Sequence, residues 1–270
     1  MSELRIGVSG WKYRKWRGDF YPSGLRQADE LGYLAQRMNS AEINGSFYSL
    51  RKPEHYAAWR DATPADFRFA VKGGRFITHM KKLNEPEVGL ANFFASGPLA
   101  LGGKLGPFLW QLPEVLHFDP TRLRAFLELL PRTTEAVSEL AQRCDRDIVA
   151  EPFTESPPMR VRHAIEVRHE SYHDSEFAHM LREHGVALVL ADTAGRFPRF
   201  DDVTADFIYV RLHGPHRLYF GSYRPDLIGV WAQRVRQWLD AALDVFVYFD
   251  NDADGAAPFD AIALADAVQA

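Results

Sequence analysis

The chain has 270 residues, 46% of them hydrophobic, and a formal net charge of −4 at pH 7. That charge argues against a strongly basic nucleic-acid surface, and no segment reaches the roughly 18 uninterrupted apolar residues of a membrane-spanning helix. Cys144 is the single cysteine, which excludes an intrachain disulfide, and Met1 to Val8 has no signal-peptide pattern. The sequence therefore predicts a soluble, cytoplasmic protein without a membrane partner.

Short apolar runs alternate with segments of helical periodicity along the chain. The runs predict strands at Leu4–Val8, Ser40–Ile43, Phe67–Val71, Phe108–Trp110, His163–Val167, Val186–Ala191, Phe207–Val210 and Val245–Phe249. Apolar residues at helical spacing, together with Pro, Asp and Gly at segment ends, predict helices at Gln27–Met38, Pro53–Ala62, Glu85–Ala95, Thr121–Leu130, Thr133–Cys144, Asp174–His184, Pro225–Ala242 and after Pro258. Thr193–Asp206 is the poor fit, because it is polar and broken by Gly195 and Pro198.

Alternation of strands and helices favours parallel strands joined by right-handed crossovers. Eight such units close into a (β/α)8 barrel, for which about 250 residues is typical. We therefore expect an α/β protein with a single TIM-type barrel domain over residues 1–270 and an irregular sixth crossover at Thr193–Asp206. An open doubly wound sheet is the weaker alternative, because no glycine-rich fingerprint follows the first strand.

Polar side chains stand where each predicted strand ends. In barrels of this type the loops after the strands build the active site. The residues at these positions are Ser9, Trp11, Glu42, Asn44, Lys72, Gln111, Glu166, Arg168, Asp192, Arg211, His213, Asp250, Asn251 and Asp252. A ligand site is the favoured interpretation. The alternative is a structural network in which Glu42 and Glu166 pair with Lys72, Arg168 and Arg211.

Several of these positions lie in a set of blocks that resembles the YecE-like family, also called domain of unknown function 72. The blocks are Gly10-Trp11, Phe20-Tyr21-Pro22, Glu42 to Tyr48, Phe69 to Lys72, Ile77-Thr78-His79, Gln111-Leu112-Pro113, Ile165 to His169, Tyr209 to Gly214 and Tyr248 to Asp252. The resemblance implies a TIM-type barrel and no established activity. It points to Glu42, Asn44, Lys72, His79, Gln111, Glu166, Arg168, Arg211, His213 and Asn251. Asp250 and Tyr172 depart from the Asn and Trp that the family pattern leads us to expect.

The two glutamates suggest acid–base chemistry. Glu42 and Glu166 come from the second and fifth strands, and two carboxylates with separated pKa values can act as acid and base in sugar hydrolysis or isomerisation. The equally weighted alternative is that each only neutralises an Arg or a Lys. We expect Glu42, Glu166 and His213 to be catalytic, and the ligand to contact Trp11, Asn44, Lys72, His79, Gln111, Arg168, Arg211 and Asn251.

Anion binding is favoured over metal binding. Lys72-Gly73-Gly74-Arg75 places two glycines, whose N–H groups can approach an oxyanion, between two cations, although a plain turn explains these glycines equally well. Oxygen and nitrogen ligands for a divalent metal exist, but no pair has diagnostic spacing, so a bound metal is less favoured. These candidates are His79, His213, Glu42, Glu166, Asp192 and Asp252.

Aromatic residues of the first loop and later rim support a further alternative. Trp11, Tyr13, Trp16, Tyr21, Phe47, Tyr48, Tyr219 and Tyr223 include faces that can stack on bases, which suggests a nucleic-acid-binding or endonuclease-like barrel. Packing of half of them under the first loop is the more favoured explanation. The leading hypothesis is a barrel enzyme, a hydrolase or isomerase, acting on a small polar, anionic or sugar-like molecule; a non-catalytic binding barrel is the third. The sequence specifies neither the substrate nor the oligomeric state.

Overall fold

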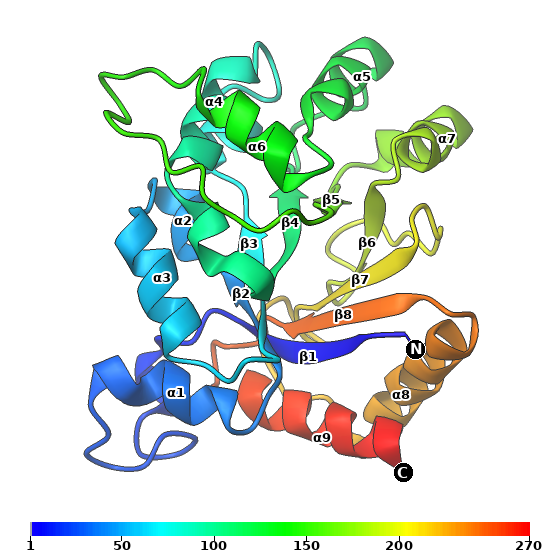
Figure 1. Ribbon diagram of the computed structural model, residues 1–270. Helices are drawn as coiled ribbons and strands as arrows, with labels where there is room; N and C mark the ends of the chain where they lie inside the picture. Colours follow the sequence, from blue (N-terminus) through cyan, green and yellow to red (C-terminus); the bar gives the residue numbers. More distant parts are fainter. Residues whose placement is uncertain (1) are drawn as a thin grey trace. The chain divides into compact units, whose positions relative to one another are not determined.

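A closed barrel of eight parallel strands in sequence order forms the centre of the computed structural model, which describes residues 2–270 (Figure 1). The strands are β1 Leu4–Ser9, β2 Ser40–Ile43, β3 Arg68–Lys72, β4 Leu105–Gln111, β5 His163–Glu166, β6 Ala187–Asp192, β7 Phe207–Leu212 and β8 Asp244–Phe249. Each predicted strand overlaps an observed one. The predicted (β/α)8 fold class is therefore confirmed.

Helices follow most of the strands. They are α1 Glu30–Ala35, α2 Gly45–Tyr48, α3 Pro53–Asp61, α4 Glu87–Ala95, α5 Pro120–Leu129, α6 Thr134–Ala141, α7 Ser175–Glu183, α8 Pro225–Asp240 and α9 Ala257–Gln269. Short 3₁₀ segments are η1 Arg14–Trp16, η2 Gln27–Asp29, η4 Pro98–Lys104 and η5 Glu170–Tyr172, and η3 Phe76–Met80 is a π-helical turn. Thr193–Asp206 contains no helix or strand, which confirms the irregular sixth crossover.

Chain contacts separate the protein into two compact units. Unit 1 comprises the chain up to Glu42 together with Ala187–Ala270, and unit 2 comprises Ile43–Val186. Unit 1 therefore holds β1, β6, β7, β8 and most of β2, whereas unit 2 holds β3, β4 and β5. The prediction of one domain over residues 1–270 stays a prediction.

Unit 1 is held by pairing of β1 and β7 with the two sides of β8. Gly7 of β1 and Arg211 of β7 both lie in register with Tyr248. Helices α8 and α9 pack on this part of the sheet and on each other (Figure 1). The apolar stripe of α8, including Ile228, Trp231 and Val235, is buried because its 3.6-residue period faces one side.

Unit 2 has an aromatic core around Trp110. The Trp110 ring meets Phe93 and Phe126 edge to face, and its indole Nε1–H donates to Nδ1 of His163 at 3.1 Å. The other ring nitrogen of His163 lies 2.7 Å from the carbonyl oxygen of Pro131. Burial lowers the pKa of His163 to about 3, so this core histidine is neutral at pH 7.

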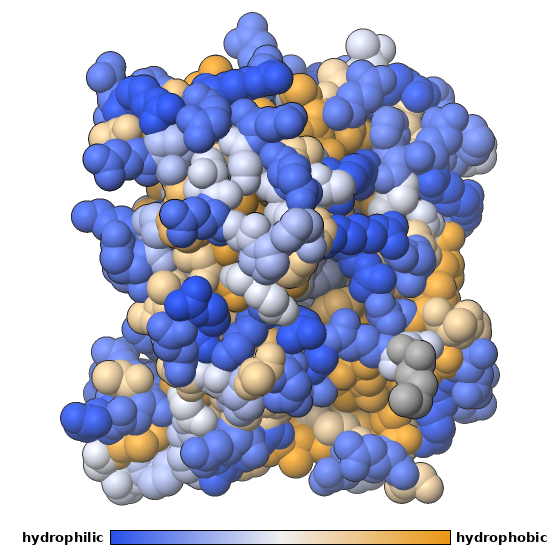
Figure 2. Space-filling model, in the orientation of Figure 1, coloured by the Kyte–Doolittle hydropathy of each residue, from blue (hydrophilic) through white to orange (hydrophobic). Residues whose placement is uncertain are grey.

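The visible face of the molecule is mainly polar (Figure 2). On the face seen in Figure 2, hydrophilic side chains cover most of the surface and hydrophobic ones appear in patches between them. The longest helix, α8, has 16 residues. Within residues 2–270, no helix combines the length and the apolar character needed to cross a membrane.

Candidate functional site

Glu42, in β2 of unit 1, has a carboxylate enclosed by four donor groups. Its Oε1 accepts from Ser9 Oγ at 2.5 Å and from Arg211 Nη2 at 2.8 Å. Its Oε2 accepts from Tyr209 OH at 2.7 Å and from Arg211 Nε at 3.1 Å. The side chains of Glu42 and Arg211 are 0% and 1% exposed. This bidentate pair neutralises a charge whose burial is otherwise costly, which explains a glutamate inside a short buried strand.

Arg211 also links Glu42 to Asp250 and His213. Its Nη2 lies 3.0 Å from Asp250 Oδ2, and its Nη1 lies 3.4 Å from His213 Nε2. The other nitrogen of the buried imidazole, Nδ1, lies 3.0 Å from the same Asp250 oxygen. We call these residues, with Ser9 and Tyr209, the Glu42 network. In this network Arg211 is shared by two carboxylates at the carboxyl end of its strand.

Asn251 and Trp11 hold the loops of unit 1. The amide nitrogen of Asn251 donates to Gly221 O and to Asp260 Oδ2, both at 2.7 Å. Trp11 is buried, and its carbonyl oxygen accepts from Tyr21 OH at 2.8 Å. Both predicted ligand residues therefore have contacts that position the backbone near the strand ends.

Asp252 follows β8 and is a buried carboxyl group in an unusual environment. Its side chain is 8% exposed, and among residues 2–270 no side chain makes a well-aligned hydrogen bond to either carboxyl oxygen, although the nearby Tyr13 hydroxyl and Trp16 indole favour its charged form. Burial raises the pKa of Asp252 well above its ordinary value, and the nearby charge of Asp250 adds to the increase. The raised pKa favours the protonated form of Asp252, which can then donate a proton.

Three neighbouring strands of unit 2 each end in a polar residue. Lys72, Gln111 and Glu166 are the last residues of β3, β4 and β5, and Gln111 lies in register with Glu166. Glu166 is 1% exposed, and its Oε1 accepts from Arg168 Nε at 2.8 Å and from Nη2 at 2.7 Å. This ion pair is one of those that the structural alternative predicts, as is the pair between Glu42 and Arg211.

His79, in η3, lies near three cations and one carboxylate. Its pKa is lowered to about 4, most strongly by burial and also by the positive charges of Lys72, Arg168 and Arg75, against the opposing effect of Glu166. We call Lys72, Arg75, His79, Glu166 and Arg168 the cationic cluster. With His79 neutral at pH 7, three positive charges face one negative charge.

The His79 ring is oriented by neutral partners. Its Nδ1 lies 2.9 Å from Thr78 Oγ1, and its Nε2 lies 3.5 Å from the amide nitrogen of Gln111. That amide also donates to Leu112 O at 2.6 Å. If Gln111 donates to the ring, the proton of the neutral imidazole lies on Nδ1.

Phe47, in α2, separates the cationic cluster from an adjacent pocket. The Nζ of Lys72 lies 4.5 Å from the centre of its ring, and His79 meets the ring edge to face at 5.0 Å. Such a cation over an aromatic face is electrostatically favourable. Asn44, the remaining predicted ligand residue of unit 2, is half-buried directly before α2.

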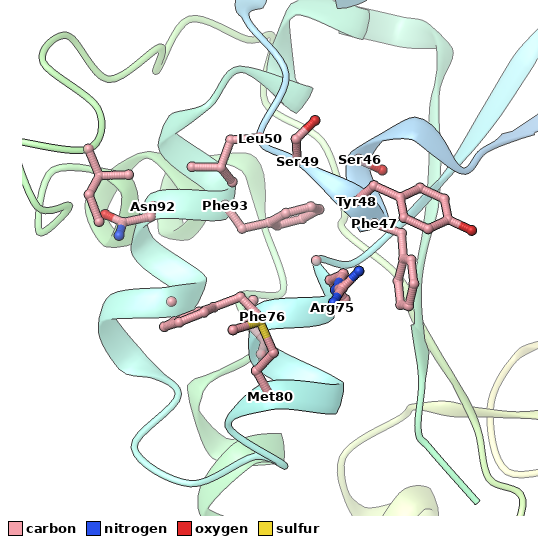
Figure 3. Close-up of a pocket in the computed structure, with 14 residues that line it drawn as sticks. Ser46, Phe47, Tyr48, Ser49, Leu50, Arg75, Phe76, Met80, Asn92 and Phe93 are labelled. Carbon is pink, nitrogen blue, oxygen red and sulfur yellow. The ribbon is translucent and has the colours of Figure 1, made fainter.

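The pocket beyond Phe47 has a volume of about 410 Å³. Its lining comes from the Ser46–Leu50 segment, Gly74 and Arg75 with the following η3, α4 and Ile148. In Figure 3, Ser46–Leu50 lie along one side and Phe76 and Met80 along the other, with Arg75 between them. We call this the apolar pocket. No strand-end motif points to this pocket, and its one local signal is the four-residue spacing of Phe76 and Met80, which indicates that both face one side.

The aromatic residues predicted for the rim differ in how far they are buried. Trp11, Trp16 and Tyr21 are buried, with Trp16 and Tyr21 packed ring against ring at 5.7 Å. Tyr48 and Tyr219 are exposed. Tyr223 is buried as well, and Tyr13 and Phe47 are half-buried, so packing of half of the set under the first loop stays a prediction. Nucleic-acid binding stays a prediction.

The predicted residues thus form one group in each unit. Unit 1 brings together Glu42, Arg211 and His213, and unit 2 brings together Lys72, His79, Gln111, Glu166 and Arg168. An acid–base pair of Glu42 and Glu166 joins residues of different units and stays a prediction. Within the described residues, no three His, Cys, Asp or Glu side chains are arranged to hold a metal ion.

Comparisons with known proteins give one family. The model of the family described as "Protein of unknown function DUF72" matches residues 5–270. Two curated proteins named UPF0759 protein YecE, from Escherichia coli strain K12 and from O157:H7, are each 28% identical over 239 residues. These alignments cover 87% of this chain and 82% of each relative.

Solved structures of two DUF72 family proteins have the same fold. One from Thermotoga maritima has a TM-score of 0.72 at 23% identity, covering 99% of this chain and 100% of its own. One from Enterococcus faecalis has a TM-score of 0.74 at 19% identity, covering 99% of this chain and 96% of its own. At these identities the likeness concerns the fold alone.

Proposed function

The chain belongs to the family of proteins of unknown function DUF72, as its sequence motifs predict, and we propose that it is a barrel enzyme whose cationic cluster binds a small polar, anionic or sugar-like molecule. The ligand would bind in a pocket at the carboxyl ends of the strands, where enzymes with this fold have their active sites. The reaction is acid–base chemistry, a hydrolysis or an isomerisation.

The charge balance around His79 is the observation that supports this proposal. Lys72, Arg75 and Arg168 all lower the pKa of His79, which places three cations near one half-buried ring with Glu166 as the opposing charge. Like charges gathered at the ends of strands repel one another. An anionic ligand relieves this repulsion, so the arrangement favours its binding.

Four members of the cluster, and the adjacent Gln111, then have a role. Lys72 and Arg168 hold the anionic group by charge-assisted hydrogen bonds, and Gln111 and neutral His79 orient the polar remainder of the ligand. Glu166 is the general acid or base, because it is the one carboxylate among the residues that shift the pKa of His79. The two contacts from Arg168 to its Oε1 fix its position.

The Glu42 network contributes differently. Four donors already occupy the two oxygens of Glu42, so its main effect in this proposal is to hold Arg211. His213 and Asp250 lie 3.0 Å apart and form a second acid–base candidate in unit 1. Catalysis by His213 can be separated from binding by comparing His213→Gln with Glu166→Gln.

A ligand screen with charge-matched variants tests the proposal. Isothermal titration calorimetry of inorganic phosphate, sulfate and a panel of sugar acids would be run on wild type, Lys72→Met and Lys81→Met. Lys81 is an exposed lysine that does not shift the pKa of His79 and serves as the control. We expect Lys72→Met to weaken anion binding by roughly tenfold or more, the loss of one charge-assisted hydrogen bond, and Lys81→Met to leave it unchanged. Equal affinity in all three proteins would contradict the proposal.

Turnover separates the enzyme from a non-catalytic binding barrel. For a ligand found in the screen, Glu166→Gln should bind it and fail to convert it. Wild type that binds without converting it would leave the non-catalytic barrel as the better account. Salt-dependent retention of wild type on single-stranded DNA, absent for the small-anion enzyme, would favour the nucleic-acid alternative.

A further inference from the structure

The apolar pocket and the cationic cluster share two residues. Phe47 lies beneath the Nζ of Lys72 and also lines the pocket. Arg75 contributes to the lowered pKa of His79 and also lines the pocket. All of these residues lie in unit 2. A ligand bound at the cluster therefore has an adjacent cavity in which a further part of it can bind.

The walls of the pocket are apolar and partly exposed. Met80, Ile148, Phe76 and Leu50 are 62%, 58%, 47% and 39% exposed. These side chains surround a volume of about 410 Å³, within the range of roughly 300–1,000 Å³ that is typical of small-molecule sites. A contiguous apolar surface of this kind is costly in water, and burying it against a ligand recovers free energy.

The polar side chains that line the pocket differ in whether they already have hydrogen-bond partners. Ser46 Oγ donates to Lys72 O at 2.6 Å, and Asn92 Oδ1 accepts from the backbone N–H of Asp145 at 2.8 Å. Arg75 is the single charged lining residue, and no hydrogen bond or ion pair joins it to another described residue. The pocket therefore offers one cation at the end nearest the cluster and a mostly apolar lining elsewhere.

We propose that the apolar pocket is a second subsite that takes the aliphatic or aromatic body of an amphipathic organic anion, whose charged group binds at the cationic cluster. This inference rests on the proposed function and narrows its substrate class. Arg75 and Phe47 mark the boundary between the two subsites. Small anions without an apolar body use the cluster alone and bind more weakly.

A chain-length series tests the second subsite. Binding of acetate, butanoate, hexanoate and octanoate would be measured by isothermal titration calorimetry at constant ionic strength. Burying one methylene group corresponds to about a fourfold gain in affinity. We expect wild type to show a gain of about this size for each methylene until the pocket is full.

Exposed apolar residues provide variants of the pocket wall and a control variant outside the pocket. Phe76→Gln and Met80→Gln alter the pocket wall, and Val88→Gln changes a residue that is 54% exposed on α4 and does not line the pocket. All three remove apolar surface without changing charge. We expect the double variant Phe76→Gln/Met80→Gln to flatten the chain-length series and leave acetate affinity unchanged, whereas Val88→Gln should behave as wild type.

The possible results separate the two proposals. A flat series in wild type, with acetate and octanoate bound equally and Lys72→Met weakening both, would overturn the second subsite and leave the anion site standing. A steep series that persists in the double variant would place the apolar body elsewhere and also overturn it. Absence of binding for every carboxylate, phosphate and sulfate would overturn the proposed function itself.

Discussion

Replacing Glu42 by Gln tests whether this residue is a structural anchor. The substitution keeps the shape of the side chain and one acceptor oxygen but places an NH₂ group where an oxygen accepted hydrogen bonds. Arg211 donates to both oxygens, at 2.8 and 3.1 Å, so in either amide orientation an N–H of the guanidinium faces another N–H donor. The charge that balances this 1% exposed guanidinium is also lost.

The magnitude follows from these losses. A hydrogen bond to a charged group contributes about 1.5–3 kcal/mol, and removing one partner of a buried ion pair costs about 3–5 kcal/mol. Asp250, 3.0 Å from Arg211 Nη2, stays as a second partner and limits the cost. We therefore expect the free energy of unfolding to fall by about 2–4 kcal/mol, a large share of the roughly 5–15 kcal/mol of an ordinary protein.

Urea denaturation followed by circular dichroism and tryptophan fluorescence measures this change. Glu87→Gln is the control, because Glu87 is 52% exposed and pairs with Arg143 at the surface. Its loss should cost at most about 1 kcal/mol. The structural account would be refuted if the Glu42→Gln variant were as stable as wild type but turned the ligand over at a different rate. That result would support a catalytic role for Glu42.

Two further predictions concern single buried positions. Gly73→Ala should lower the free energy of unfolding, measured by urea denaturation, by about 1–3 kcal/mol, because a Cβ there would lie 2.3 Å from the buried Trp110 ring. The control Gly103→Ala should leave it unchanged, because a Cβ at Gly103 would have nothing within 4 Å. Equal effects of the two substitutions would contradict this steric argument. Asp252→Asn should gain stability relative to wild type as pH rises above the ordinary carboxyl pKa of 3.8. The raised pKa means that the folded state holds this proton more tightly than the unfolded state, so the stability of the wild type falls as pH rises towards the folded pKa. A stability difference between Asp252→Asn and wild type that is constant between pH 4 and 8 would contradict this prediction.

The fold was predictable because its signals are local. Buried parallel strands appear as short apolar runs, and their polar ends appear as abrupt changes in residue type, as at Val71-Lys72 and Trp110-Gln111. Pro53 and Pro120 both lie at the first turn of observed helices, where proline is favoured. The Asn44-Gly45 pair was less informative. It indicates a turn, whereas the structure has the short helix α2 directly after Asn44.

The site was predictable in its membership but not in its pairing. Strand ends identified Glu42, Arg211, Glu166 and Arg168, yet their partners depend on register and side-chain direction, which lie outside any short window of sequence. Arg168 pairs with a residue two positions away, whereas Arg211 pairs with one 169 positions away. The apolar pocket depends on four separate segments of unit 2, so only its Phe76 and Met80 spacing was visible beforehand.

The response of the His79 pKa to a bound anion tests the central claim most directly, because burial lowers this pKa most and the charges of the cationic cluster lower it as well. NMR titration of the imidazole, assigned with a His79→Gln variant, would be run with and without sulfate, which stays fully ionised across the titration. We expect a pKa of about 4 without sulfate, well below the ordinary 6.5, and a higher pKa with it, because a bound anion offsets Lys72, Arg75 and Arg168. A pKa near 6.5 that sulfate does not change would contradict a net positive, anion-binding cluster.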